Sequence, residues 1–282
     1  MINNQFRVDS VIRTALEEDL GSGDITTDAI IDPDSKGKAI LETREQVVLA
    51  GLPVFCRAFE LIGPEIKFET FYEDGELVET GETICNISGS LSVILKAERT
   101  ALNFLQRMSG IATLTREYVS MAGSDNVRIL DTRKTAPGLN LFDKYSVRMG
   151  GGFNHRFGLY DGILIKDNHI TAAGSVAEAV NLAKKNSPHT VRVEVEVEDL
   201  AGVEEAVKAG ADAILLDNMT YTEIREAVHL IAGKILVEAS GGITLENINE
   251  IARTGVDLIS VGALTHSVRA VDLSLELIAR DS

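Results

Sequence analysis

Many residues of this chain that could do chemistry lie between Asp131 and His169. The basic motifs in this stretch are Asp131-Thr132-Arg133-Lys134-Thr135, Gly151-Gly152-Phe153-Asn154-His155-Arg156 and Ile165-Lys166-Asp167-Asn168-His169. Short apolar runs typical of strands precede Asp131 and Lys166, and glycine- or proline-containing turns lie nearby. A cation just beyond a strand end is poorly placed for core packing and well placed to bind an anion. The stretch therefore predicts a pocket for an anionic ligand.

The composition limits what that ligand can be. The chain has 27 Lys and Arg residues against 43 Asp and Glu residues, a formal net charge of -16. A basic cluster in an acidic protein indicates a local pocket for a small anion and disfavours a nucleic-acid surface. The 282 residues, 45% of them hydrophobic, fit one large α/β domain or two domains. No run approaches the roughly 18 apolar residues of a membrane span.

The cysteines and the N-terminal segment indicate where in the cell the protein is expected. Cys56 and Cys85 show no CxxC spacing, so we interpret them as reduced core residues of a cytosolic protein, with a disulfide as the alternative. The segment Met1–Gln5 lacks a basic region followed by an apolar block, so we expect no signal peptide. The sequence therefore predicts a cytoplasmic protein.

The pattern of helices and strands expected over residues 1–110 predicts a small α/β domain. The expected elements are helices over Asp9–Leu20 and Val54–Leu61, an extended segment over Lys36–Ala50, and strands over Lys67–Tyr72, Gly75–Val78 and Glu82–Ser88. Asp9 or Ser10 is the expected helix cap. The run Asp74–Ile84 resembles the strands of lipoyl or biotinyl carrier domains, but no lysine stands at the hairpin tip. A structural lid or platform is the preferred interpretation.

A long helix is expected over Leu91–Met121, with Gly110 breaking or kinking it. Arg99 lies on this helix. Its position alone is typical of an exposed cation or one paired with a glutamate.

After Val127 short apolar strands alternate with amphipathic helices. The expected strands are Arg128–Leu130, Ile163–Ile165, Val191–Val197, Ala213–Leu216, Ile235–Val237 and Leu258–Val261. The expected helices are Phe142–Met149, Ser175–Asn186, Ala201–Ala209, Thr222–Ile231 and Leu245–Arg253. This alternation predicts a parallel sheet with right-handed crossovers, and its length favours an α/β barrel. Six strands are clear and a short seventh is possible near Phe153–Asn154, so a complete eight-strand barrel is not supported.

Polar or glycine residues follow nearly every one of these strands. They are Thr132, Arg133, Lys134, Lys166, Asp217, Ser240, Gly241, Gly242 and Gly262, with Ala263 after Gly262, while Glu196 stands at the end of its own strand. Because the catalytic groups of barrels come from the C-terminal strand ends, the pattern predicts one shared site.

Glu194, Glu196 and Glu198 alternate along one strand, so their side chains share a face. A barrel strand is covered on both sides, so a carboxylate there needs a partner, such as Lys134, Lys166 or a ligand-borne metal. Glu196 is our choice for the functional carboxylate, and a structural neighbour role for Glu194 or Glu198 stays open.

Two glycine-containing loops late in the chain suit phosphate binding. Ser240-Gly241-Gly242-Ile243 precedes the expected helix at Leu245, and Gly262-Ala263 follows the next strand. Glycine in a turn is weak evidence by itself, but two consecutive loops match the usual phosphate site of barrels. We expect His155 to contact an anion or a ring, and His169 to be a supporting or core histidine.

Together these motifs resemble the quinolinate phosphoribosyltransferase family, the decarboxylating nicotinate-nucleotide pyrophosphorylases. The matching segments are Glu17–Thr26, Glu98–Asn103, Asp131–Thr135, Gly151–Arg156, Leu164–His169, Glu194–Val197, Leu215–Asn218, Glu238–Ile243 and Val261–Ser267. They run in order over nearly the whole chain.

The resemblance implies an N-terminal α/β sandwich domain over 1–110, on which the tail 270–282 packs, and an open seven-stranded α/β barrel over 111–269. It implies that quinolinate and phosphoribosyl pyrophosphate react with Mg²⁺ to give nicotinate mononucleotide, pyrophosphate and CO2, on the de novo route to NAD. It also implies a homodimer, or a higher oligomer, whose site is built at the subunit interface.

The resemblance also assigns roles to residues. Quinolinate binding falls to Arg133, His155 and Arg156, with Lys134 nearby and Arg99 contributed by the partner subunit. Lys134 and Lys166 face phosphoribosyl pyrophosphate, while Glu196 and Asp217 hold ribose hydroxyls or Mg²⁺ and stabilise developing positive charge. The loops Ser240–Gly242 and Val261–Ala263 hold the 5′-phosphate.

Two rival functions remain at this point. A phosphoribosyltransferase-like family linked to molybdate uptake shares the fold and would act on another ring substrate. A non-catalytic phosphosugar-binding barrel is the other, and the intact set of cations argues against it.

Overall fold

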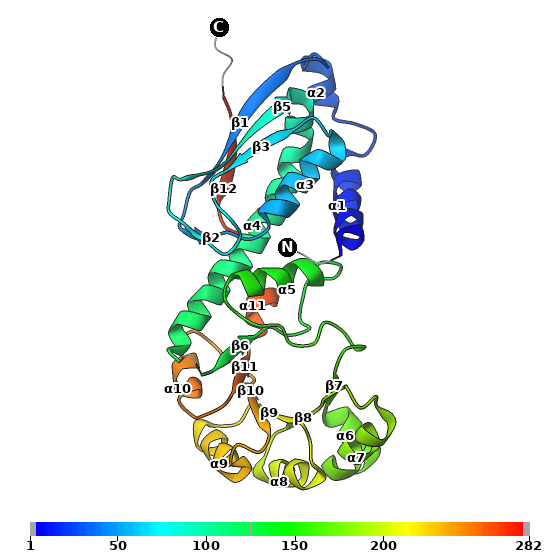
Figure 1. Cartoon of the computed structure of the whole chain (residues 1–282), viewed down its shortest axis with the longest axis vertical. Coiled ribbons are helices and arrows are strands. Elements are labelled where there is room, and N and C mark those ends of the chain that lie inside the picture. Colours follow the sequence, from blue (N-terminus) through cyan, green and yellow to red (C-terminus); the bar gives the residue numbers. More distant parts are fainter. Residues whose placement is uncertain (1–3, 125, 279–282) are drawn as a thin grey trace. The chain divides into compact units, whose positions relative to one another are not determined.

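The computed structural model describes residues 4–124 and 126–278. The chain divides into two compact units (Figure 1). The first comprises Met1–Arg116, Ala136–Gly151 and Val268–Ser282, and the second Glu117–Thr135 and Gly152–Ser267. Residues 1–3 of the expected N-terminal domain and residues 279–282 of the expected tail lie outside the described residues.

The first unit is built on an antiparallel sheet. Its strand order is β12-β1-β5-β3, with bounds Leu273–Leu277, Lys36–Thr43, Thr83–Ser90 and Lys67–Thr70. A two-stranded ribbon joins β2 (Val47–Val48) to β4 (Leu77–Val78). The alternating burial along β1 leaves one face for the core. β12, near the C-terminus, pairs with β1 from Ala39↔Leu277 to Thr43↔Leu273.

Helices pack against this sheet around one core. The helices are α1 (Gln5–Leu20), α2 (Ile25–Ile30), α3 (Leu52–Ile62), α4 (Leu91–Ala122) and α5 (Asn140–Met149). The core joins residues of α1, β1, α3, β5 and α4, with Phe55 and Phe59 among its largest fully buried side chains. The expected cap of α1 was wrong. Asn4 caps the helix by accepting from the Arg7 backbone N–H, so the helix begins four residues before Asp9.

Of the break or kink expected at Gly110, the break does not occur, because α4 is continuous from Leu91 to Ala122. A Cβ at Gly110 would lie 2.2 Å from the Arg269 carbonyl oxygen. Glycine is therefore present because another backbone segment approaches the helix closely, not because the helix ends there.

The second unit contains a parallel sheet of order β6-β11-β10-β9-β8-β7, which confirms the predicted α/β class. The bounds are Arg128–Leu130, Leu258–Ser260, Leu236–Ser240, Ala213–Asp217, Val193–Val197 and Ile163–Ile165. The expected seventh strand near Phe153 is a single parallel bridge to Leu130. This bridge extends the sheet beside β6, and β7 lies at the other end of the order.

Helices follow the strands as expected for right-handed crossovers. They are α6 (Asp167–Ala173), α7 (Val176–Asn186), α8 (Leu200–Ala209), α9 (Tyr221–Ile231), α10 (Ile248–Ala252) and α11 (Ala263–His266). In Figure 1, α7, α8 and α9 lie on one side of the curved sheet. Within residues 4–124 and 126–278, no helix has the length and apolar character needed to cross a membrane.

Candidate active site

A cavity of about 380 Å³ lies among the carboxyl ends of the parallel strands in the second unit. Nine of the predicted site residues line it: Thr132, Arg133, Lys134, His155, Arg156, Lys166, Glu196, Asp217 and Ser240. Leu164, Leu215, Glu238 and Ser260 complete the lining. Parallel strands end at one edge of a sheet, so residues far apart in sequence meet there.

Asp131 ties the loop that carries His155 to the end of β6. Its buried carboxylate accepts from the His155 backbone N–H at 2.9 Å and from Asn154 Nδ2 at 2.5 Å. The Phe153 backbone N–H donates to the Ile129 carbonyl, which holds the same loop beside the strand. Asp131 was read as the start of a motif and not as a site residue, because only the fold shows what its carboxylate orients.

The turn after β6 presents two exposed cations, Arg133 and Lys134. Thr132 Oγ1 accepts from the Lys134 backbone N–H at 3.0 Å, which tightens the turn. Thr265 donates its hydroxyl to the Lys134 carbonyl at 2.9 Å, and a Cβ at Gly262 would lie 3.2 Å from the Lys134 side chain. Lys134 is thus packed against the loop after β11, where the predicted phosphate site begins.

Arg156 is a partly buried cation with unused donors. One of its terminal nitrogens donates to the Gly162 carbonyl at 2.9 Å, but its buried Nε has no hydrogen-bond partner among the described residues. Burial, and then the charge of Arg133, lowers the pKa of Arg156. An arginine desolvated beside a second arginine is suited to a ligand that brings negative charge.

Lys166 and Glu196 form an ion pair in the cavity, with Nζ 2.5 Å from Oε2. The Glu196 side chain is 15% exposed and that of Lys166 is 45% exposed. Asp217, the last residue of β9, accepts from Asn218 Nδ2 at 2.9 Å. Carboxylates on neighbouring strands offer the oxygen ligands that Mg²⁺ prefers.

A cluster that sequence reasoning missed lies beside these residues. His155 Nε2 is 3.1 Å from Glu194 Oε2 and 3.8 Å from Glu238 Oε1. The three potential ligand atoms lie within 4.8 Å of one another, but His155 Nε2 and Glu194 Oε2 already contact each other, and we assign no metal to the cluster. Glu238 was quoted only within the Glu238–Ile243 motif, because an isolated glutamate in an apolar strand does not reveal which face it occupies.

The glycine loops fit phosphate binding less directly than expected. The helix after Ser240–Gly242 begins at Ile248 and not at Leu245, and Asn247 accepts from the Thr244 backbone N–H. Gly241 has φ +90°, and a Cβ there would lie 2.3 Å from Asn218 Oδ1, so local packing alone requires glycine. Gly241, Gly242, Val261, Gly262 and Ala263 flank the cavity lining in sequence and are not part of it.

His169 and Arg99 are not among the residues that line this cavity. His169 is exposed, and its Nδ1 accepts from the Lys166 backbone N–H at 2.9 Å at the start of α6, so the core alternative was wrong. Arg99 is exposed on α4 in the first unit, whereas every lining residue of the cavity belongs to the second. The role expected for Arg99 stays a prediction.

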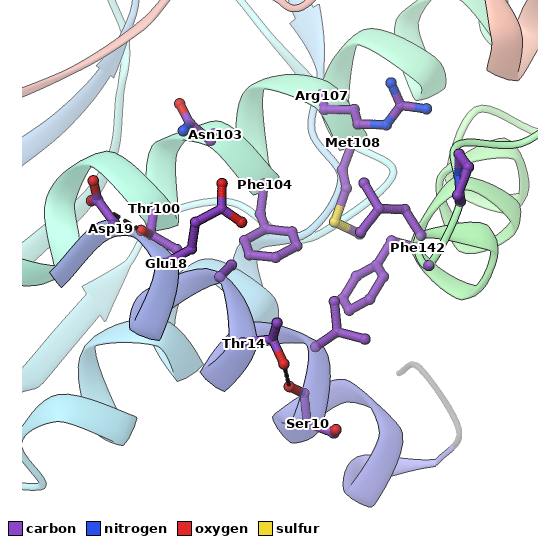
Figure 2. A pocket seen from close by; sticks show the side chains of 15 residues that line it. Ser10, Thr14, Glu18, Asp19, Thr100, Asn103, Phe104, Arg107, Met108 and Phe142 are labelled. Atoms are coloured by element: carbon purple, nitrogen blue, oxygen red, sulfur yellow. Dashed lines mark hydrogen bonds between the residues drawn. The ribbon is translucent and has the colours of Figure 1, made fainter. Parts of the chain in front are cut away.

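A larger cavity of about 710 Å³ lies in the first unit, between α1, α4 and α5. Figure 2 shows Phe104, Met108 and Phe142 turned toward one another there, and the rings of Phe104 and Phe142 are 5.4 Å apart. Its Arg107 is already paired with Asp143 at 2.9 Å. Size alone would favour this cavity, but the convergent cations favour the smaller one as the anion site.

Comparisons with known proteins place the whole chain in a family. Two family models match: "Quinolinate phosphoribosyl transferase, N-terminal domain" over residues 24–109 and "Quinolinate phosphoribosyl transferase, C-terminal domain" over residues 111–276. The chain is 42% identical over 274 residues to the probable nicotinate-nucleotide pyrophosphorylase (carboxylating) of Bacillus subtilis, covering 97% of this chain and 94% of that one. It is 44% identical over 277 residues to the protein of the same name from Methanocaldococcus jannaschii, covering 95% and 96%.

A solved structure is similar over the whole length. The crystal structure of NadC from Streptococcus pyogenes has a TM-score of 0.94 at 45% identity and covers 98% of this chain and 99% of its own. Because two family models and relatives above 40% identity span nearly all of its residues, the chain belongs to the quinolinate phosphoribosyltransferase family.

Proposed function

We propose that this protein transfers the phosphoribosyl group of phosphoribosyl pyrophosphate to quinolinate, with decarboxylation. The products are nicotinate mononucleotide, pyrophosphate and CO2, and the reaction belongs to NAD biosynthesis. The observation that carries the proposal is the unpartnered Arg156 Nε beside Arg133, in a cavity that also contains Lys134, Lys166 and His155. The family membership of the whole chain supports the same reaction.

Quinolinate is a pyridine with two neighbouring carboxylates. Arg133 and Arg156 offer guanidinium forks that suit carboxylates, and Lys134 adds a point charge nearby. His155 forms a wall of the same pocket, and Arg99 of the partner subunit completes it from outside. This last contact requires a homodimer or a higher oligomer, which is part of the proposal. A cytoplasmic location is also part of the proposal.

Phosphoribosyl pyrophosphate occupies the other side of the cavity in this scheme. Lys134 and Lys166 face its phosphates, and the loops Ser240–Gly242 and Val261–Ala263 bind the 5′-phosphate. Lys166 now neutralises Glu196, so the arriving phosphates compete for the lysine and leave the carboxylate available to the ribose. The ion pair therefore holds the two side chains in position before substrate binds.

Mg²⁺ fits the same carboxylates. Glu196 and Asp217 stand at the ends of adjacent strands with partly exposed side chains, and Mg²⁺ is usually held by one or two carboxylates together with substrate phosphates. The ion would neutralise the pyrophosphate charge that develops during its departure.

The residues supply positioning and electrostatic stabilisation, and no covalent nucleophile is needed. The ring nitrogen of quinolinate forms a bond to the anomeric carbon while the bond to pyrophosphate breaks, and Glu196 stabilises the positive charge on the ribose. The bond from C2 to its carboxylate then breaks. The quaternised ring nitrogen stabilises the electron pair left on C2, which takes up a proton.

The two rival functions have less support. The relatives spanning this chain carry the pyrophosphorylase name, and the cation set suits two carboxylates instead of an unrelated ring. A thermal-shift and turnover comparison tests the proposal. We expect turnover of quinolinate with phosphoribosyl pyrophosphate and none of nicotinate, because nicotinate lacks the second carboxylate and leaves part of the cation set of the cavity unpaired. Nicotinate turnover at a comparable rate would contradict the proposal.

A further inference from the structure

The interior of the second unit contains a carboxyl group that the proposed reaction does not use. Glu238, on β10, is 1% exposed and lines the same cavity as the cations. Its Oε1 has no hydrogen-bond partner among the residues that the structure describes. Buried polar atoms are nearly always satisfied, so a buried carboxyl with unused capacity requires an explanation.

The register of the sheet directs Glu238 toward the site. Glu196 pairs with Leu215 on β9, and Leu215 pairs with Glu238 on β10. Side chains paired in this way project from the same face of a sheet, and Glu194 shares that face because it lies two residues before Glu196. Glu194 and Glu238 therefore approach His155 from two strands that are separated by β9.

The hydrogen bonds of His155 define its protonation. Its Nδ1 accepts from the Arg156 backbone N–H at 2.7 Å, so no proton can reside on that nitrogen in this arrangement. The ring proton is then on Nε2, which faces Glu194 Oε2 at 3.1 Å and Glu238 Oε1 at 3.8 Å. The imidazole is fixed as the Nε2–H tautomer, between the two carboxyl groups and the backbone of Arg156.

The charged form of Glu238 is disfavoured in this cluster. Burial, and then the charge of Glu194, raises the pKa of Glu238 to about 8, because burial disfavours the charged carboxylate and like charges repel; His155 and the Ser260 hydroxyl act in the opposite direction. A protonated Glu238 can donate to Glu194, and a hydrogen bond between them also raises this pKa. Glu194 can then accept from Glu238 on one side while it faces His155 Nε2 at 3.1 Å on the other.

We propose that Glu238 is a positioning residue for the dicarboxylate pocket, holding the His155 imidazole and the Arg156 backbone in place through Glu194. The inference rests on the proposed use of quinolinate and names the residue that orients the binding wall. Glu238 needs no contact with either substrate. Its loss should therefore affect the quinolinate half of the site and leave the phosphoribosyl half intact.

Steady-state kinetics of matched variants test this. Glu238→Leu keeps the size and removes the hydrogen bonds, whereas Glu238→Gln keeps a donor and an acceptor. We expect Glu238→Leu to raise the KM for quinolinate roughly tenfold or more, the scale of losing a partner that orients a functional histidine. The KM for phosphoribosyl pyrophosphate should stay within about twofold, and Glu238→Gln should restore the quinolinate KM.

Two further variants separate positioning from general damage to the barrel. Thr254→Val removes a buried hydrogen bond to Ile251 in the second unit, away from the cavity lining, and should change neither KM selectively. Glu194→Ala removes the acceptor that His155 faces, and should raise the quinolinate KM like Glu238→Leu. If Glu238→Leu does not fold, an unchanged quinolinate KM in Glu194→Ala would overturn the inference, because Glu238 is proposed to act through Glu194.

A readout independent of turnover is the ring tautomer of His155, observed by NMR of histidine labelled with ¹⁵N and assigned with His155→Gln. We expect the Nε2–H tautomer in the unaltered protein and a shifted or broadened signal in Glu238→Leu. An unaltered His155 signal or quinolinate KM in Glu238→Leu, or a parallel rise of both KM values, would overturn the inference. If the unaltered protein fails to use quinolinate, the proposed function fails, while the NMR comparison still decides the role of Glu238.

Discussion

The ammonium of Lys166 lies 2.5 Å from Glu196 Oε2, so two groups from different strand ends that line the cavity neutralise each other. The pair is partly exposed, and its carboxylate lies on the same sheet face as Leu215 and Glu238. A partly solvated pair can exchange partners when a highly charged ligand enters, which a fully buried pair cannot do without a large penalty.

Glu196→Gln should lower kcat by roughly 10²-fold or more, the scale of losing one preorganised electrostatic contact. The amide keeps the shape and hydrogen bonding of the carboxylate but cannot stabilise positive charge on the ribose. The affinity for quinolinate should change less, which kcat and a separate Kd measurement would show. Glu198→Gln is the matched control, since Glu198 is exposed beyond the end of β8. A near-normal kcat for Glu196→Gln with a crippled Glu198→Gln would mean that the wrong carboxylate was chosen.

Arg99→Ala should lose quinolinate binding while the melting temperature stays close to that of the unaltered protein, because an exposed helix cation contributes little to stability. Mixing Arg99→Ala with Arg156→Ala chains should restore part of the activity, since a mixed dimer rebuilds one intact site. A chain carrying both substitutions is the control. When it is mixed with either single variant, no site contains both Arg99 and Arg156, so no activity should return. Demonstrated subunit exchange without recovery would argue against a shared site.

Gly110→Ala should destabilise the protein, although alanine in place of glycine usually stabilises a helix by up to about 1 kcal/mol. The added Cβ would lie 2.2 Å from the Arg269 carbonyl oxygen, so one backbone segment must move. We expect a loss of roughly 1–3 kcal/mol, the cost of overpacking, measured by urea unfolding. Ser120→Ala, at an exposed position of the same helix, should be neutral or slightly stabilising. Equal stability gains at both positions would show that the Arg269 segment does not constrain the helix.

Glu238→Gln should gain stability relative to the unaltered protein as the pH rises. The folded protein retains a proton on Glu238 up to a pKa of about 8, whereas the ordinary value is 4.5. Between these values the folded state binds more protons than the unfolded state, so the stability contributed by this proton is present at low pH and is lost toward pH 8. The glutamine variant has no such loss.

Melting temperatures measured across this pH window would show the effect as a growing difference between Glu238→Gln and the unaltered protein. Thr254→Val changes no titratable group, so its difference from the unaltered protein should stay constant. A constant difference for Glu238→Gln as well would mean that Glu238 is ionised in the folded protein.

Much of the fold could be predicted from local pattern. The bounds of β6 and β7 agree with the expected runs, because each is a short apolar segment limited by turn-forming residues. The errors in the predicted elements lie where a helix cap or a segment distant in sequence determines the local structure. Asn4 starts α1 early, α10 starts late at Ile248, and Gly110 is explained by Arg269, which lies far away in sequence.

The convergence of the site could also be predicted, since the carboxyl ends of parallel strands meet at one edge. Thr132, Lys166, Glu196 and Asp217 were identified as strand-end residues, and all four line one cavity. Their roles in the reaction stay predictions.

The sequence by itself determined which charged groups this protein has and that they follow successive strands of an α/β unit. Only the tertiary structure decided their partners: Lys166 with Glu196, His155 with Glu194, and an Arg156 Nε that remains without one among the described residues. The reason is that these pairings depend on the register of β8, β9 and β10 and on how the loop at His155 is tied to Asp131. Register and loop position arise from packing of the whole sheet, which no local run of residues encodes.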